Sequence, residues 1–291
     1  MKIVITGSNG FIGKKLSAHF RQHEHEVVGL DIDEDIHTLR CDITRDNLDD
    51  LIPDGADAVI HLAALSRDKD CSNNAQTTNQ VNILGTQRLV EAAQKKGVKQ
   101  FIFASTEWVY DNFDDTQFKT EESIINLHNL DSEYAASKYV AESNLKLYFK
   151  HYQLPTTILR FGIIYGPRKE NWSAVEALLN NVASKQKVEV GCLKTGRCFI
   201  HVDDVITGIE ATLGLPGFEI LNLQGDEFVT LQEVLDAAQK SLNKQVEIGE
   251  GNSSQPSIRK VSNSKMKNML EWTPKYNIYS GIEAIKNEVL N

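Results

Sequence analysis

Three glycines follow the first apolar run of the chain, at a spacing that restricts what can form there. Lys2–Thr6 has the pattern of a buried strand, Gly7, Gly10 and Gly13 come next, and Phe11–His23 has the apolar spacing of a helix. Glycines allow a tight turn and let a pyrophosphate approach the backbone closely. The helix N-terminus then offers N–H groups and a positive dipole end to the anion. The sequence therefore predicts a dinucleotide-binding turn.

An acidic residue follows the second predicted strand. Asp31 comes directly after Glu26–Leu30, 18 residues after Gly13 (31 − 13). A carboxylate at this place can hold both ribose hydroxyls of NAD, and it would repel the 2′-phosphate of NADP. We therefore predict that the cofactor is NAD. A purely structural glycine turn is the weaker interpretation.

Strands and helices alternate over the first half of the chain. Ala58–Leu62, Phe101–Ala104 and Thr156–Phe161 are further predicted strands, and Gln76–Lys95 and Tyr134–His151 are predicted helices between them. This alternation implies βαβ units. The predicted fold is α/β, with a doubly wound, Rossmann-type parallel sheet covered by helices on both faces.

The pattern changes after Gly166 and Pro167, where shorter elements follow one another. In chain order we expect Val188–Val190, Phe199–Val202, a helix from about Asp204, a strand near Ile220–Leu223, and helices at Thr230–Leu242 and Ile278–Val289. We predict a dinucleotide-binding domain over 1–166 and a smaller C-terminal α/β substrate lobe over 167–291, partly interleaved with the first domain.

Composition and charge exclude several classes of protein. The chain has 291 residues, a formal net charge of -9 and no basic run, which argues against nucleic-acid binding. None of its four cysteines forms a CxxC pair, so we expect reduced thiols in a cytoplasmic protein. We find no secretory signal, and no apolar run near the ~18 residues that span a membrane.

A tyrosine and a lysine lie four residues apart in a predicted helix. At this spacing Tyr134 and Lys138 share one helical face. A phenol, with a reference pKa near ~10, is a poor base at neutral pH. A neighbouring ammonium and the positive nicotinamide ring of NAD⁺ both favour the phenolate, which suits general acid–base catalysis. An amphipathic helix whose tyrosine merely packs is the alternative.

The Gly-x-x-Gly-x-x-Gly spacing resembles that of the extended short-chain dehydrogenase/reductase family. Within it, the chain is similar to the NAD-dependent sugar-nucleotide epimerase/dehydratase group, which includes UDP-glucose 4-epimerase-like enzymes. Further segments that resemble family motifs are spread along the chain: Asp42–Ile43, His61–Ala64, Val81–Thr86, Arg197–Val205 and Leu270–Tyr276.

The resemblance implies roles for individual residues. The implied catalytic residues are Thr106, Tyr134 and Lys138. The implied substrate-binding residues are Thr106, Glu107, Trp108 and Arg197. The implied cofactor-binding residues are Gly7, Asn9, Gly10, Phe11, Ile12, Gly13, Asp31, Asp42, Ile43, Leu62, Ala63, Ala64, Asn82, Ser105, Tyr134, Lys138 and Phe161.

The residues after Thr106 bear on the reaction type. The family's 4,6-dehydratases have Thr-Asp-Glu here, and its decarboxylases also place a carboxylate third. In this chain Glu107 could replace the acid, but Trp108 cannot act as a base. We therefore favour an NAD-dependent epimerase of the 4-epimerase type, acting through a transient keto sugar. A ketoreductase, a dehydratase or a non-catalytic NAD-sensing or NAD-binding protein are the alternatives.

The substrate is less constrained by the sequence. Arg197 matches a family arginine that clamps a nucleotide diphosphate. A second family arginine, expected within 251–256, has no match, and Arg259 is the nearest candidate. Ile163 stands where the family usually has an asparagine, and Glu133 stands where it has a proline. A nucleotide sugar is favoured, while another sugar or a small ketone remains open.

Two further features concern partners and metals. By resemblance we expect a homodimer that forms through the predicted helices 76–95 and 134–151. The second helix carries apolar residues on more than one face: Tyr139, Val140, Leu147, Tyr148 and Phe149. His19 and His23 share a face near Glu24 and His25 and could bind a divalent metal. A solvated helix end is the favoured interpretation, because no second cluster converges in the sequence. We therefore predict no metal.

Overall fold

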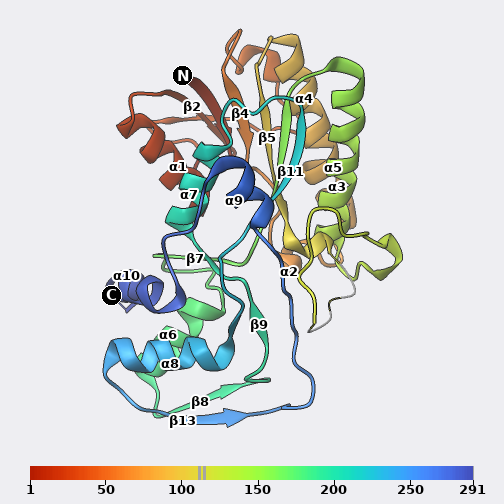
Figure 1. Ribbon diagram of the computed structural model, residues 1–291. Helices are drawn as coiled ribbons and strands as arrows, with labels where there is room; N and C mark the ends of the chain where they lie inside the picture. The colour runs from red at the N-terminus through yellow and green to blue at the C-terminus, as the bar shows by residue number, and fades with distance from the viewer. Residues whose placement is uncertain (111–112, 114–115, 291) are drawn as a thin grey trace. The chain divides into compact units, whose positions relative to one another are not determined.

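The computed structural model describes residues 1–110, 113 and 116–290 (Figure 1). Its internal contacts divide the chain into two units. Unit 1 contains Met1–Asp111, Ile124–Arg160 and Ile209–Leu221, and unit 2 contains Asn112–Ser123, Phe161–Gly208 and Asn222–Asn291. The predicted domains, 1–166 and 167–291, remain a prediction. In the described part of the chain, no helix is both long and apolar enough to cross a membrane.

A seven-stranded sheet forms the centre of the fold. Its strands are β1 (Lys2–Thr6), β2 (Glu26–Asp31), β3 (Thr38–Arg40), β4 (Ala58–His61), β5 (Phe101–Thr106), β6 (Thr156–Phe161) and β11 (Phe218–Leu223). Their order is β11-β6-β5-β4-β1-β2-β3, and β1 pairs in parallel with both β2 and β4. The Rossmann-type α/β prediction is confirmed. The strand order reverses between β1 and β4, where such sheets bind ligands beyond the carboxyl ends of the strands.

Helices cover both faces of this sheet. The helices of unit 1 are α1 (Phe11–Gln22), α2 (Asp68–Cys71), α3 (Ala75–Asn79), the π-helix η2 (Gln80–Gly85), α4 (Thr86–Lys95) and α5 (Glu133–Tyr152), and short 3₁₀ turns lie at η1 (Leu48–Asp50), η3 (Glu107–Val109) and η4 (Leu127–Asn129). The helix α7 (Val202–Ala211) begins in unit 2 and ends in unit 1. α1 lies on one face, and α4 and α5 lie on the other (Figure 1). The helix predicted over 76–95 is present without a break, but its middle is a π-helix. Apolar spacing alone does not show the π turn, which often marks a functional site.

Unit 2 contains the smaller α/β lobe that the sequence predicted. Its elements are β7 (Ile164–Tyr165), α6 (Ala174–Ser184), β8 (Lys187–Val190), β9 (Gly196–Arg197), β10 (Ile200–His201), β12 (Val229–Thr230), α8 (Leu231–Leu242), β13 (Glu247–Glu250), α9 (Ser264–Leu270) and α10 (Ile278–Leu290). The strand predicted at Phe199–Val202 is shorter, because α7 already begins at Val202. The Asp203 N–H donates to Nδ1 of His201 at this helix start.

Each unit has its own apolar core. In unit 1, Leu89 and Val90 of α4 and Leu145 of α5 pack with Phe101 and Phe103 of β5, and all five are nearly or fully inaccessible. In unit 2, α6, α8 and α10 pack against one another. Their apolar residues are at helical spacing, so one stripe of each helix is buried.

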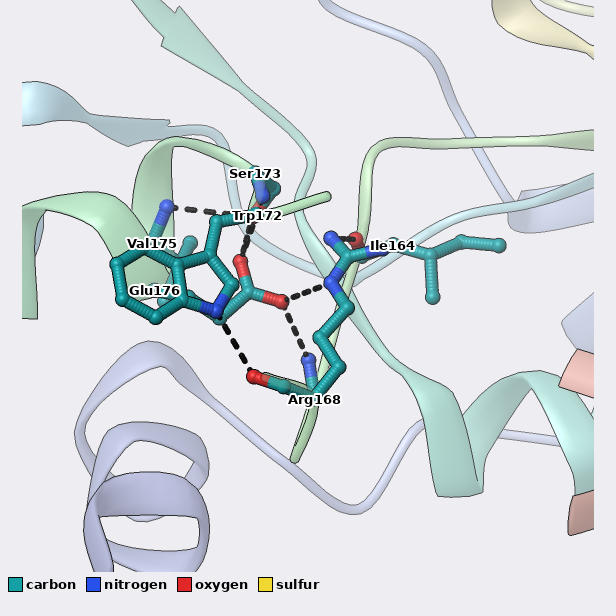
Figure 2. A network of polar contacts seen from close by, with 7 residues as sticks. Ile164, Arg168, Trp172, Ser173, Val175 and Glu176 are labelled. Carbon is teal, nitrogen blue, oxygen red and sulfur yellow. Dashed lines mark hydrogen bonds and ion pairs between the residues drawn. The ribbon is translucent and has the colours of Figure 1, made fainter. Parts of the chain in front are cut away.

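A buried carboxylate organises the loop before α6. Glu176 is fully inaccessible, and its Oε1 accepts hydrogen bonds from Nε of Arg168 (2.7 Å) and from the Gly166 N–H (3.1 Å). Its Oε2 accepts from the Ser173 N–H, which completes a capping box with the Ser173 hydroxyl. Figure 2 shows Arg168 and Ser173 around this carboxylate. The loop that follows β7 is thus held by one side chain.

Replacing this carboxylate by an amide should destabilise the protein. Glu176→Gln keeps the shape but leaves the guanidinium of Arg168 without its charged partner, and breaking such a pair costs about 3 kcal/mol. Urea unfolding should show a lower midpoint. Glu170→Gln, at an exposed site in the same loop, should change stability by less than about 0.5 kcal/mol. Equal effects of the two variants would contradict the role given to Glu176.

Candidate active site

The turn between β1 and α1 is packed too tightly for side chains. Gly7 has a φ of +71°, and a Cβ there would lie 2.7 Å from the Ala63 nitrogen. A Cβ on Gly13 would lie 2.0 Å from the Gly7 carbonyl oxygen. Gly10 caps α1 without a side-chain bond, and the first turn of α1, all of it described, has no acidic residue. These features fit an anion at the helix N-terminus.

Asp31 lies beside this turn as the last residue of β2. Its Oδ2 accepts the Asn9 N–H at 2.9 Å, and its Oδ1 accepts the Asp33 N–H at 3.2 Å. These bonds fix the carboxylate next to the glycine turn. Each oxygen keeps a further lone pair, which is what ribose hydroxyls would need. The site therefore fits NAD, as predicted from the sequence.

Asp42 and Ile43 form a turn next to the π-helix. Both the N–H and the hydroxyl of Thr44 donate to Oδ1 of Asp42, and the hydroxyl bond is the main cause that lowers the pKa of this carboxyl. Ile43 is buried, and a Cβ on Gly85 would lie 2.8 Å from its Cδ1. The structure thus gives Asp42 a local role, and its contact with the cofactor remains a prediction.

A buried hydrogen-bond chain, which the sequence did not reveal, starts in the loop after β4. Burial, and to a smaller extent the charge of Lys138, lower the pKa of His61 to about 3, so its imidazole is neutral. The Thr86 hydroxyl donates to the Asn82 carbonyl (2.7 Å), so its oxygen accepts from Nε2 of His61 (2.9 Å). Nδ1 of His61 then accepts from Thr6 (2.7 Å), whose oxygen accepts the Ala63 N–H (3.3 Å).

Asn82 connects the loop after β4 to α5. Its side chain exchanges two hydrogen bonds with the backbone of Leu65, at 2.9 and 3.0 Å. Its Nδ2 also donates to Ser137 (3.0 Å), whose hydroxyl donates to the Tyr134 carbonyl (2.8 Å). Asn82 was predicted to bind the cofactor. In the structure it positions the helix that carries Tyr134, and a direct cofactor contact remains a prediction.

The three predicted catalytic side chains lie together in unit 1. Burial raises the pKa of Tyr134 to about 12, and a hydrogen bond with the Thr106 side chain opposes this rise. Burial also lowers the pKa of Lys138 to about 7, while the negative charge of Glu142 opposes this fall. Nζ of Lys138 donates to the Ala104 carbonyl at 2.8 Å and lies 4.6 Å from the ring centre of Phe103. Both titratable groups are therefore strongly perturbed, which is typical of functional sites.

A buried ion pair that the sequence analysis missed supports this group. Glu142 lies one helical turn after Lys138 and accepts Nη2 of Arg160 at 2.6 Å. Nη1 of Arg160 donates to the Tyr110 hydroxyl at 2.9 Å, and the Ser105 hydroxyl donates to Glu142 at 2.5 Å. The network joins β5, α5 and β6. The only signal in the sequence was an i, i+4 spacing from Lys138 to Glu142.

The predicted substrate residues fall into two sets. In unit 1, Glu107 and Trp108 lie in η3; Glu107 is fully buried, Trp108 is partly buried, and the Trp108 N–H donates to Thr106 Oγ1 at 3.2 Å. In unit 2, Arg197 lies on β9. Phe161, predicted to bind the cofactor, is buried at the end of β6.

The structure brings a second arginine beside Arg197. Gly196 forms a parallel bridge with Ile258, and the Arg259 N–H donates to the Gly196 carbonyl at 3.2 Å. Arg197 and Arg259 are therefore neighbours in register. Nη2 of Arg197 also donates to the Ser257 hydroxyl at 2.9 Å. The sequence showed no family match for the second arginine within 251–256. The position of Arg259 depends on pairing between two segments that lie about 60 residues apart in the chain.

Comparisons with known proteins agree with this geometry. The sequence model of the NAD dependent epimerase/dehydratase family matches residues 3–222. An uncharacterized UDP-glucose epimerase of Bacillus subtilis is 28% identical over 309 residues, which cover 97% of this chain and 96% of that protein. A dTDP-D-glucose 4,6-dehydratase of Dictyostelium discoideum is 31% identical over 242 residues, covering 73% of this chain and 55% of that protein.

A solved structure shows the same fold over nearly the whole chain. The UDP-glucose 4-epimerase of Thermus thermophilus, in complex with NAD, has a TM-score of 0.85 and 25% identity, and 99% of each chain is covered. The glycine turn, Asp31 and the Tyr134–Lys138 helix lie within the residues that the family model matches. The chain belongs to the NAD-dependent epimerase/dehydratase family.

Proposed function

We propose that the protein is a nucleotide-sugar epimerase of the 4-epimerase type. The observation that carries the proposal is the group of Thr106, Tyr134 and Lys138 at the end of β5, followed by Trp108 instead of a carboxylate. Several relatives are named as enzymes of nucleotide sugars, among them a UDP-glucuronate 4-epimerase of Thermodesulfobacterium geofontis, 24% identical over 98% of this chain. These names support the substrate class.

The residues of the chain have separate tasks in this proposal. The glycine turn and Asp31 hold NAD, which supplies reversible redox chemistry when bound. Tyr134 takes the proton of a sugar hydroxyl and later returns it, and Thr106 orients the same oxygen. Lys138, one helical turn from Tyr134, favours the phenolate when it is protonated. Reduction of the keto sugar at its other face would then give the epimer.

The alternatives differ from an epimerase in the groups or in the cofactor turnover that they need. Elimination of water requires a base beside the reacting sugar, and an indole at Trp108 has no basic group. A ketoreductase would use the same three residues but would consume a reduced cofactor. An NAD-sensing protein would have no need of this acid–base group. The product formed and the cofactor consumed therefore distinguish an epimerase, a dehydratase, a ketoreductase and a sensing protein.

The paired arginines support a nucleotide diphosphate as part of the substrate. Arg197 and Arg259 are adjacent in unit 2, and guanidinium groups bind phosphate oxygens through paired N–H donors. Ile163 offers no hydrogen bond from its side chain where the family has an amide. In our proposal the arginine pair therefore carries most of the diphosphate binding.

Removing the Tyr134 hydroxyl should abolish most turnover. Tyr134→Phe keeps the ring and its packing, so we expect an unchanged fold and retained NAD, with a rate about 10²–10⁴-fold lower. Thr106→Ala should lower the rate less, because it only orients the substrate oxygen. Tyr139→Phe, on the same helix, is the control. Near-normal turnover of Tyr134→Phe would refute the Tyr–Lys mechanism.

The assay itself tests the function. Purified protein is incubated with UDP-, dTDP-, GDP- and CDP-sugars, and products are followed by NMR, mass spectrometry and the absorbance of bound NADH. An epimer of unchanged mass supports the proposal. Loss of one water would identify a dehydratase, and net consumption of NAD(P)H would identify a ketoreductase. No product from any sugar would favour the sensing protein.

Burial of Lys138 should make stability depend on pH. Its pKa in the folded protein, about 7, lies below the ordinary value of 10.5, so between these values the unfolded chain binds more protons and stability rises with pH. With the cofactor removed, Lys138→Met should therefore raise the melting temperature most near pH 7 and least near pH 10. Lys146→Met, at an exposed site on α5, should show no such trend. A pH-independent gain in Lys138→Met would contradict this account.

We also propose that the protein forms a homodimer through η2, α4 and α5. Leu84 is 58% exposed on η2, and Val140 (38%) and Leu147 (56%) are seven residues apart on one face of α5, whereas Tyr148 is buried in the core. Exposed apolar stripes of this kind mark association surfaces. A cytoplasmic location remains a prediction.

The dimer can be tested by light scattering at micromolar concentration. The wild type should have twice the mass of the chain, and Leu147→Glu should shift it toward the monomer because a charge would be buried at the contact. Leu39→Glu alters an equally exposed leucine on β3 and should leave the mass unchanged. A monomeric wild type would end the proposal.

A further inference from the structure

Three potential metal ligands of unit 1 lie together at the ends of two helices. His19 and His23 lie at the end of α1, and Glu210 lies in the last turn of α7, 191 residues from His19. Nε2 of His19 is 2.9 Å from Oε2 of Glu210, and the rings of His19 and His23 are 4.3 Å apart. One ligand atom from each of the three lies within 4.8 Å of the others.

We propose that His19, His23 and Glu210 bind a divalent transition-metal ion of the zinc class. Two imidazole nitrogens and one carboxylate oxygen are a ligand set that zinc uses, with water in the fourth position. Bonds of about 2.1 Å in a tetrahedral shell place ligand atoms roughly 3.4 Å apart. Nε2 of His19 and Oε2 of Glu210 are already closer than this, and small rotations of the exposed His23 ring would bring its nitrogen to the same distance.

The hydrogen bonding of His23 suits this role. One of its ring nitrogens, Nδ1, lies 2.8 Å from the His19 carbonyl oxygen and so must carry the proton. Nε2 therefore keeps its lone pair for a metal. A bond from the second ring nitrogen to a backbone carbonyl is the usual arrangement around metal-binding histidines, because it fixes the tautomer and the ring.

The electrostatics of the two helices favour a cation here. α1 and α7 both end beside this cluster, and helix C-termini carry partial negative charge. Glu210 adds a full negative charge at such an end, which is unfavourable without a nearby cation. The side chains of His19 and Glu210 are only 21% and 35% exposed, so solvent screens these charges incompletely. A divalent ion would offset the negative charge of Glu210 and of the two helix ends, and it would connect α7 to α1, which begins at the glycine turn.

Zinc binding to the untagged, chelator-treated protein tests the proposal without any activity assay. Isothermal titration calorimetry with Zn²⁺ should show one binding site per chain, and this binding should depend on the three ligand residues. Zn²⁺ should also raise the melting temperature by about 5 °C. His23→Gln and Glu210→Gln should each weaken binding about 10- to 100-fold or more, because each removes a ligand. Circular dichroism checks that the variants fold.

A nearby histidine provides the control. Nδ1 of His25 lies 3.1 Å from the N-terminal amine, and His25 is not part of the cluster. Because an amine and an imidazole this close together could also bind Zn²⁺, they are the alternative site that the test must exclude. His25→Gln should bind Zn²⁺ like the wild type. The proposal is overturned if the wild type binds no Zn²⁺, if His25→Gln abolishes binding, or if folded His23→Gln and Glu210→Gln bind as tightly as the wild type.

Discussion

The buried ion pair between Glu142 and Arg160 is the contact on which the active-site helix depends. Both side chains are nearly inaccessible, and α5 could not pack on the sheet with an uncompensated carboxylate at this position. Glu142 also accepts a hydrogen bond from the Ser105 hydroxyl, and Arg160 also donates one to the Tyr110 hydroxyl. The elements that flank the site thus provide further hydrogen-bond partners for both charged groups. Replacing the ion pair by apolar residues could keep the stability. It would, however, remove the negative charge that partly offsets the burial of Lys138.

The chain of hydrogen bonds through His61 gives the site its second constraint. The imidazole is neutral, and its two nitrogens have opposite roles, one accepting from Thr6 and one donating to Thr86. The donor and the acceptor of every bond are then fixed along the whole chain, which begins at the Ala63 N–H and ends at the Asn82 carbonyl. Because Asn82 also bonds Ser137, the loop after β4 and the first turn of α5 are positioned together. A protonated His61 could not accept from Thr6, so burial that keeps the ring neutral also preserves the geometry.

Local patterns account for what could be predicted from the sequence. The glycine turn, Asp31 and the Tyr134–Lys138 spacing each depend on residues close together in the chain, and the strand and helix periods give the fold class. The π turn at Asn82 was not predictable, because one extra residue in a turn leaves the apolar spacing almost unchanged. Long-range pairings were also missed. Glu142 looks like a surface residue until Arg160 lies beside it, and Glu210 lies 191 residues from His19. Arg259 was named only as the nearest candidate, because local patterns do not show its pairing beside Gly196.

The same frame can serve different reactions because proton transfer and elimination depend on different residues. Tyr134 bonds Thr106 and Lys138 bonds Ala104, whereas Trp108 donates to Thr106 through its backbone N–H. The residue after Glu107 can therefore vary between a carboxylate and an indole without disturbing the acid–base pair. A carboxylate there adds a base for removing water, whereas an indole adds only apolar surface. This separation explains how epimerases and dehydratases can share one fold and differ in the short segment after β5.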